Sequence, residues 1–170
     1  MRAWLDRLYE AAGWLAAAFM IGTLVFVLLG IFGRLLDFHV RGTDAYAGYC
    51  MAASGFLALA YTLRRNEHIR VTLLLGHVPE AARKALDIWC HAIAVALAGI
   101  LAFYSVRLVW QSRAFNDIST ANDATPLWIP QLGMALGTSI LFIAFIDAFV
   151  AVVRGGGSDA PAADEPARIE

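Results

Sequence analysis

The sequence is poor in charged residues, which make up 16% of its 170 residues, and it has only two cysteines. Soluble domains carry about 25% charged and roughly 45–50% apolar residues, whereas the apolar share here is 60%. The formal net charge of −1 implies no general attraction to nucleic acid or to acidic substrates. The length suits one domain, and the composition indicates a membrane protein.

Asp, Glu, Lys and Arg are missing altogether from four long stretches. These are residues 11–33, 45–63, 88–106 and 124–146, and the last apolar run continues to Val153. A helix that crosses the hydrocarbon core of about 30 Å needs roughly 20 residues. A soluble helical bundle would need polar stripes facing water, and the first stretch shows none. We therefore expect an all-α integral membrane domain, 1–154, with four transmembrane helices at about 11–33, 45–63, 88–106 and 127–153.

The first span is not expected to be a cleavable signal peptide, because its apolar run exceeds the roughly 7–15 residues of such segments. Orientation follows from Lys and Arg, of which nine lie in the N-terminal segment, middle loop and C-terminal segment, against four in the other two loops. The positive-inside rule then places both termini and the middle loop in the cytoplasm.

The two cysteines give little indication of a chemical function. Cys50 falls near the outer end of the second span and Cys90 near the inner end of the third, too far apart in depth for a disulfide. The sequence has no zinc-type cluster, no glycine-rich phosphate loop and no nucleophile beside a base. We expect no catalytic residue, no cofactor and no metal site.

Two ionisable residues fall inside spans, His91 and Asp147, and such residues are functional candidates by default. Both lie toward the inner surface, and His91 follows Asp87 by one helical turn. A salt bridge at a helix end is the structural interpretation of Asp147, and a proton or ion relay is the functional one. A buried haem would need two axial histidines at matched depth, whereas only His91 is intramembrane.

The middle loop has a helical pattern of its own. Val71, Leu74, Leu75 and Val78 follow the i, i+3, i+4, i+7 spacing, which predicts a short amphipathic helix in the inner interface. The alternative is a loop collapsed onto the helix ends. Pro79-Glu80 then resembles a fresh helix start.

The fourth span is expected to open at Thr125-Pro126, with the Thr125 hydroxyl as a helix cap and the proline in the first turn. Trp128 would anchor it at interfacial depth. The Gly133-to-Gly137 spacing, and the small residues Gly48, Ala52 and Gly55 of the second span, suit close helix packing. Residues 155–170 form an acidic Pro/Ala tail that should be disordered.

Two stretches carry a resemblance to a known family. The first is Arg64-Arg65-Asn66-Glu67-His68-Ile69-Arg70-Val71, running on to Val78-Pro79-Glu80-Ala81-Ala82-Arg83. The second is Ser119, then Thr125-Pro126-Leu127-Trp128-Ile129-Pro130-Gln131 and Gly137. With four spans and both ends inside, the chain resembles the small membrane subunit (DctQ-like) of tripartite ATP-independent periplasmic (TRAP) transporters. The positions that match, with a structural or partner-contact role implied, are Arg65, His68, Ile69, Val71, Pro79, Arg83, Thr125, Pro126, Trp128, Pro130 and Gly137.

The resemblance implies a function that the residues alone do not. It implies a non-catalytic scaffold in the bacterial inner membrane for a large membrane subunit, which moves organic acids with a sodium gradient. A periplasmic substrate-binding protein would be the third component. The alternatives are a stand-alone homo-oligomeric transporter or channel, or the membrane anchor of a redox enzyme.

Overall fold

The computed structural model describes residues 2–38, 40–64, 80–121 and 123–154. Within these ranges it is all-helical, with four helices and no strand: α1 (Arg2–Leu35), α2 (Thr43–Arg64), α4 (Glu80–Ala114) and α5 (Trp128–Val153). Each expected span lies inside one of these helices, apart from Leu127, which precedes α5. Helix α4 begins at Glu80, where the Pro79-Glu80 pair predicts a helix start. The expected amphipathic helix in the middle loop and the expected disordered tail lie outside the described residues.

Three of the described helices, α1, α4 and α5, are long and apolar enough to cross a membrane. Helix α2 does not reach that hydropathy, although its 22 residues span about 33 Å at 1.5 Å per residue. Its sequence explains the difference, because it carries hydroxyl groups, glycines and Asp44 among its apolar residues.

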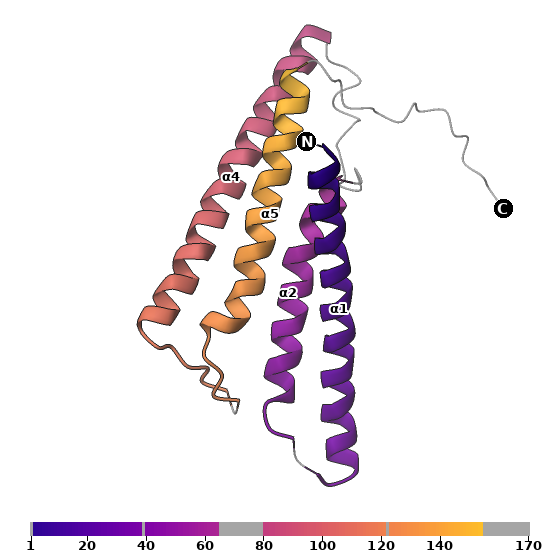
Figure 1. Cartoon of the computed structure of the whole chain (residues 1–170), viewed down its shortest axis with the longest axis vertical. Helices are drawn as coiled ribbons and strands as arrows, with labels where there is room; N and C mark the ends of the chain where they lie inside the picture. Colours follow the sequence, from indigo (N-terminus) through magenta and orange to yellow (C-terminus); the bar gives the residue numbers. More distant parts are fainter. Residues whose placement is uncertain (1, 39, 65–79, 122, 155–170) are drawn as a thin grey trace, which may run out of the picture.

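The helices form a layer in the order α1, α2, α5, α4 (Figure 1). Helix α2 packs against both α1 and α5, and α4 packs against α5. Helices α1, α2 and α5 converge where Tyr9, Ala60 and Ala144 form a buried cluster. The described residues of two connections, 36–38 with 40–42 and 115–121 with 123–127, lie at one end of the layer, called here the loop end (Figure 1).

The buried positions are mostly small, and the large apolar side chains point outward. The buried set includes Ala47, Ala53, Ala98, Ala102 and Ala135, whereas Trp14 and Trp110 are each 75% exposed. Small residues let membrane helices approach closely, and apolar surface costs nothing in lipid. This inside-out distribution suits a chain surrounded by hydrocarbon.

The turn between α1 and α2 is tight. Asp37 and Gly42 adopt positive φ angles of 54° and 79°, and glycine takes that conformation without strain. Arg34 lies in the last turn of α1 and Asp44 in the first turn of α2. Each charge therefore lies at the helix end whose dipole favours it.

Candidate functional site

The connection between α4 and α5 is a folded loop. The Ser119 amide donates to the Thr125 carbonyl at 2.9 Å, and the Leu127 amide donates to the Asp117 carbonyl at 3.0 Å. An isolated antiparallel bridge pairs Ile118 with Pro126 between these bonds. The two ends of the loop are thus tied together before α5 begins.

This loop is fastened to α2 by hydroxyl and carboxylate groups, called here the Asp123 cluster: Tyr46, Tyr49, Ser119, Asp123 and Thr125. The Tyr49 hydroxyl lies 3.0 Å from Ser119 Oγ and 3.1 Å from Asp123 Oδ2. Ser119 Oγ donates to Asp123 Oδ1 at 2.8 Å. Thr125 Oγ1 and the Tyr46 hydroxyl oxygen lie 3.2 Å apart and are hydrogen-bonded. Both tyrosines belong to the start of α2, so the cluster joins residues that are 70 to 79 positions apart in sequence.

The cluster favours the ionised form of Asp123. Burial would raise the pKa of its carboxyl, but hydrogen bonds with Thr125, Ser119, its own backbone and Tyr49 together hold that pKa below its usual value. A carboxylate that accepts several hydrogen bonds is stabilised in its charged form.

Two further contacts hold the loop end. A Cβ on Gly42 would lie 2.7 Å from the Asp123 Cβ, so the α1–α2 turn closes directly onto the loop. Arg113, in the last turn of α4, lies with its guanidinium carbon 5.5 Å from the centroid of the Trp128 ring. Cation–π contacts of this kind are favourable, and this one joins the end of α4 to the start of α5.

The expected cap of the fourth helix is wrong. Helix α5 begins at Trp128 with Leu127 as its N-cap, and no side chain bonds the cap. The Thr125 hydroxyl is used by Tyr46 instead, and Pro126 lies before the helix in the Ile118 bridge. The proline of the first turn is Pro130.

Two glycines of α5 fit closely against α2. A Cβ on Gly133 would meet the Ala53 Cβ at 2.7 Å, and a Cβ on Gly137 would meet the Phe56 backbone carbon at 2.5 Å. Gly48 and Gly55 of α2 differ, since nothing lies within 4 Å of a Cβ built on either. The close packing expected for these α2 glycines is therefore not made by any of the residues that the structure describes.

His91 and Asp147, the two ionisable residues predicted to lie within spans, are on different helices, and each has an interaction within the chain. His91 Nδ1 lies 2.8 Å from the backbone carbonyl of Asp87, one turn earlier in α4. Asp147 is half-buried on α5 and has an interaction within the chain. Cys50 and Cys90 are both free. Across the described ranges, no group of three or more His, Cys, Asp or Glu residues could hold a metal ion.

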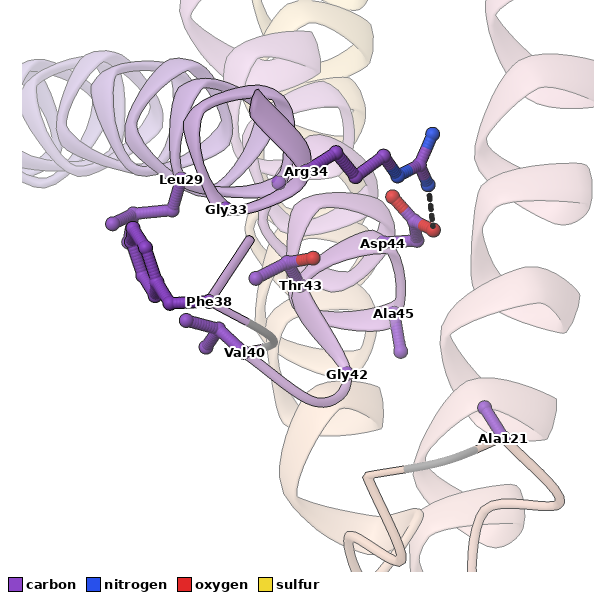
Figure 2. Close-up of a pocket in the computed structure, with 11 residues that line it drawn as sticks. Leu29, Gly33, Arg34, Phe38, Val40, Gly42, Thr43, Asp44, Ala45 and Ala121 are labelled. Carbon is purple, nitrogen blue, oxygen red and sulfur yellow. Dashed lines mark hydrogen bonds and ion pairs between the residues drawn. The ribbon is translucent and has the colours of Figure 1, made fainter. Parts of the chain in front are cut away.

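A pocket of about 270 Å³ lies at the α1–α2 turn and is called here the turn pocket (Figure 2). Leu29, Phe38 and Val40 form an apolar wall, and the Arg34–Asp44 ion pair lies on the opposite side (Figure 2). The remaining lining residues are small: Gly30, Gly33, Gly42, Thr43, Ala45 and Ala121.

The other family-motif positions are not seen in the structure. Arg65, His68, Ile69, Val71 and Pro79 lie outside the described residues, and so does the side chain of Arg83. The structure instead brings together Tyr46, Tyr49 and Asp123, which sequence reasoning missed. A signal was present, since two tyrosines three residues apart open a helix and a polar loop lies at the same expected depth.

The chain matches one family, described as "Tripartite ATP-independent periplasmic transporters, DctQ component", over residues 23–155. This match covers α2, α4, α5 and most of α1. No curated protein and no solved structure matches the chain.

Proposed function

Because this chain belongs to the DctQ component family of the tripartite ATP-independent periplasmic transporters, we propose that it is a scaffold for a large transport subunit. In this proposal the chain is non-catalytic and carries no substrate itself. The large subunit moves organic acids with a sodium gradient and receives them from a periplasmic substrate-binding protein. This assignment follows the known organisation of the family.

The observation that supports the scaffold role is that hydroxyl groups within the predicted spans donate hydrogen bonds to their own helix backbone. Thr23 Oγ1 donates to the Phe19 carbonyl at 3.0 Å, and Ser139 Oγ donates to the Ala135 carbonyl at 2.6 Å. Thr138 likewise bonds carbonyls of its own helix. A polar substrate that crosses a hydrocarbon core must be met by polar groups near the midplane. These hydroxyls are instead occupied by their own helix backbone.

We further propose that all four helices cross the bacterial inner membrane, with both termini cytoplasmic and the loop end periplasmic. Helix α2 is long enough for the hydrocarbon core of about 30 Å. Its lower hydropathy is compatible with crossing, because α1 and α5 cover it on two sides. The excess of Lys and Arg in the terminal segments and middle loop supports the orientation.

The test is purification and reconstitution. The chain is expressed with and without its genomic neighbours, and each preparation is placed in liposomes under a sodium gradient. We expect no uptake by the chain alone, and uptake by a complex with a large subunit once a binding protein is added. Substrate-specific, sodium-driven uptake by the chain alone would refute the proposal.

A further inference from the structure

We infer that the turn pocket binds the phosphoethanolamine headgroup of a phospholipid, with Arg34 facing the phosphate and Asp44 facing the primary amine. This inference requires that the chain lies in a membrane, but it does not require the scaffold role. It concerns a site at the loop end that adjoins the Asp123 cluster through Gly42 and Ala121 but uses none of its side chains.

The charges of the pocket are available to a ligand. Arg34 Nη2 lies 3.4 Å from Asp44 Oδ2, and the two side chains are 77% and 85% exposed. Exposed ion pairs at this separation contribute little to stability, so separating the Arg34 and Asp44 side chains requires little free energy. A guanidinium has five N–H donors and a carboxylate about four acceptor sites. Both groups can therefore bind a zwitterion while they stay close to each other.

The pocket also lies at the depth of lipid headgroups. The charge-free stretch of α1 covers residues 11–33, which is about 34 Å at 1.5 Å per residue. The hydrocarbon core is about 30 Å thick, and Arg34 is the first charged residue beyond this stretch. Leu29 lies about 7 Å deeper along the helix, at the level of the first acyl carbons.

The shape of the pocket suits a lipid more than a soluble ester. Its wall of Leu29, Phe38 and Val40 is apolar, and these side chains are each about two-fifths exposed. A water-soluble phosphoethanolamine ester gains nothing from this wall, whereas the glycerol and upper acyl carbons of a phospholipid bury apolar surface on it. Small residues, among them Gly30 and Ala45, line the pocket between the wall and the charges, and Thr43 packs against Gly30 there, with its Oγ1 3.2 Å from the position of an added Cβ.

The primary amine gives the site its selectivity. An ammonium group donates three hydrogen bonds, which Asp44 accepts. The quaternary amine of a phosphocholine headgroup donates none. A phosphoglycerol headgroup keeps the phosphate for Arg34 but leaves Asp44 without a cation. We therefore expect ethanolamine lipids to be preferred over both.

The experiment uses the full chain, purified and incubated with an equimolar mixture of phosphatidylethanolamine, phosphatidylcholine and phosphatidylglycerol. Native mass spectrometry then measures the ratio of bound lipids. We expect the ethanolamine lipid to exceed the choline lipid by roughly two- to fivefold, the size expected for one exposed charge pair. Equal retention of the two lipids by the unmodified chain would overturn the inference.

Four variants localise the effect. Asp44→Asn should abolish the preference for ethanolamine over choline, and Arg34→Gln should lower retention of all three lipids. Asp117→Asn and Arg107→Gln are the matched controls, because both residues are exposed and lie toward the same end of the molecule. A control that lowers the preference as much as its partner variant would contradict the site. If a variant does not fold, the ratio of bound ethanolamine lipid to bound choline lipid in the unmodified chain still tests the inference.

A competition arm separates the two sources of the headgroup. Soluble glycerophosphoethanolamine is added at increasing concentration to the lipid-bound chain. We expect it to displace the phospholipid only at concentrations far above that of the lipid. Displacement at equal concentration would overturn the assignment to a lipid.

Discussion

At the scale of single residues, the Asp123 cluster holds the loop end together. Its hydrogen bonds join the 115–127 connection to α2, and hydrogen bonds to a charged group are stronger than those between neutral groups. These hydrogen bonds are only partly buried, so water competes for the same groups. Each bond therefore contributes modestly, and the geometry of the loop depends on several of them acting together.

We predict that Tyr49→Phe lowers the stability of the purified chain by about 1 kcal/mol, the net contribution of a typical hydrogen bond. The ring stays, so packing is preserved, while Ser119 and Asp123 lose their hydroxyl partner. Thermal unfolding followed by tryptophan fluorescence measures the change. Tyr104→Phe is the control, because Tyr104 is 58% exposed on α4. An equal effect of the two substitutions would contradict the role of the cluster.

The lowered pKa of Asp123 gives a dependence on pH. A carboxyl whose pKa is lower in the folded state stabilises that state above the unfolded pKa of about 4, and this stabilisation is lost as pH falls through the folded pKa. We predict that acidification below about pH 4 lowers the melting temperature more in the unmodified chain than in Asp123→Asn. Identical pH profiles would show that this carboxylate does not stabilise the fold.

Asp147 is predicted to serve assembly or stability and not ion movement. It is half-buried and interacts within the chain, near the end of α5 and away from the middle of the span. In complexes that still assemble, Asp147→Asn should leave the sodium dependence of uptake unchanged. A changed sodium stoichiometry in a well-assembled complex would overturn this assignment.

At this scale the sequence indicates which residues lie close together within one helix, but it does not indicate which distant residues folding brings into contact. The spacing of Asp87 and His91 places them one turn apart on one helix, and the His91 ring contacts the backbone carbonyl of Asp87, although no contact with its carboxylate is shown. Tyr49 and Asp123 are 74 residues apart, and no periodicity predicts a contact of that range. Thr125 was expected to cap α5 because a hydroxyl before a helix often does, but a tyrosine of another helix competes for it.

At the scale of elements, Gly133 and Gly137 of α5 pack closely against α2, whereas no described atom lies within 4 Å of a Cβ added to Gly48 or Gly55 of α2. We predict that Gly137→Ala destabilises the chain by about 1–3 kcal/mol, the range for overpacking an interior. The added carbon would lie 2.5 Å from the Phe56 backbone carbon and 2.6 Å from its carbonyl oxygen, and backbone atoms do not move as cheaply as a flexible side chain.

Gly55→Ala is the matched control for this prediction. It is also a helical glycine, but nothing lies within 4 Å of the added carbon. Alanine favours a helix over glycine by up to about 1 kcal/mol, so stability should stay the same or rise. Melting temperatures of the two variants, measured side by side, should move in opposite directions or at least differ clearly. A loss for Gly55→Ala equal to that for Gly137→Ala would contradict the packing.

The helices themselves were predictable, because long charge-free stretches are a strong signal and each of those found here coincides with a helix. Their ends were predicted only in part. The Pro79-Glu80 pair predicts the start of α4 at Glu80, whereas α1 begins at Arg2, well before its charge-free stretch, because helical hydrogen bonding continues into polar sequence. The partners of α2 were also beyond prediction, since small residues favour close packing without specifying which helix provides it.

At the scale of the whole molecule, the layer leaves α1 and α4 with broad apolar faces. Trp14 on α1 and Trp110 on α4 are among the most exposed side chains of the described helices. In water such surfaces would drive aggregation, whereas in a bilayer they are the normal outer surface. Helix α2 is the exception, with lower hydropathy and two neighbours. Whether α2 crosses the membrane therefore determines whether the two termini lie on the same side or on opposite sides.

We predict that both termini are cytoplasmic, which requires that α2 crosses the membrane together with α1, α4 and α5. If α2 stayed in one leaflet, three crossings would place the two termini on opposite sides. The segments assigned to the cytoplasm carry nine Lys and Arg residues against four in the others, and translocation of basic segments is disfavoured. Fusions at Ser158 and Asn116 to a reporter pair, one active only in the cytoplasm and one only in the periplasm, measure the arrangement. We expect cytoplasmic activity at Ser158 and periplasmic activity at Asn116. Periplasmic activity at Ser158, or cytoplasmic activity at Asn116, would contradict the predicted orientation.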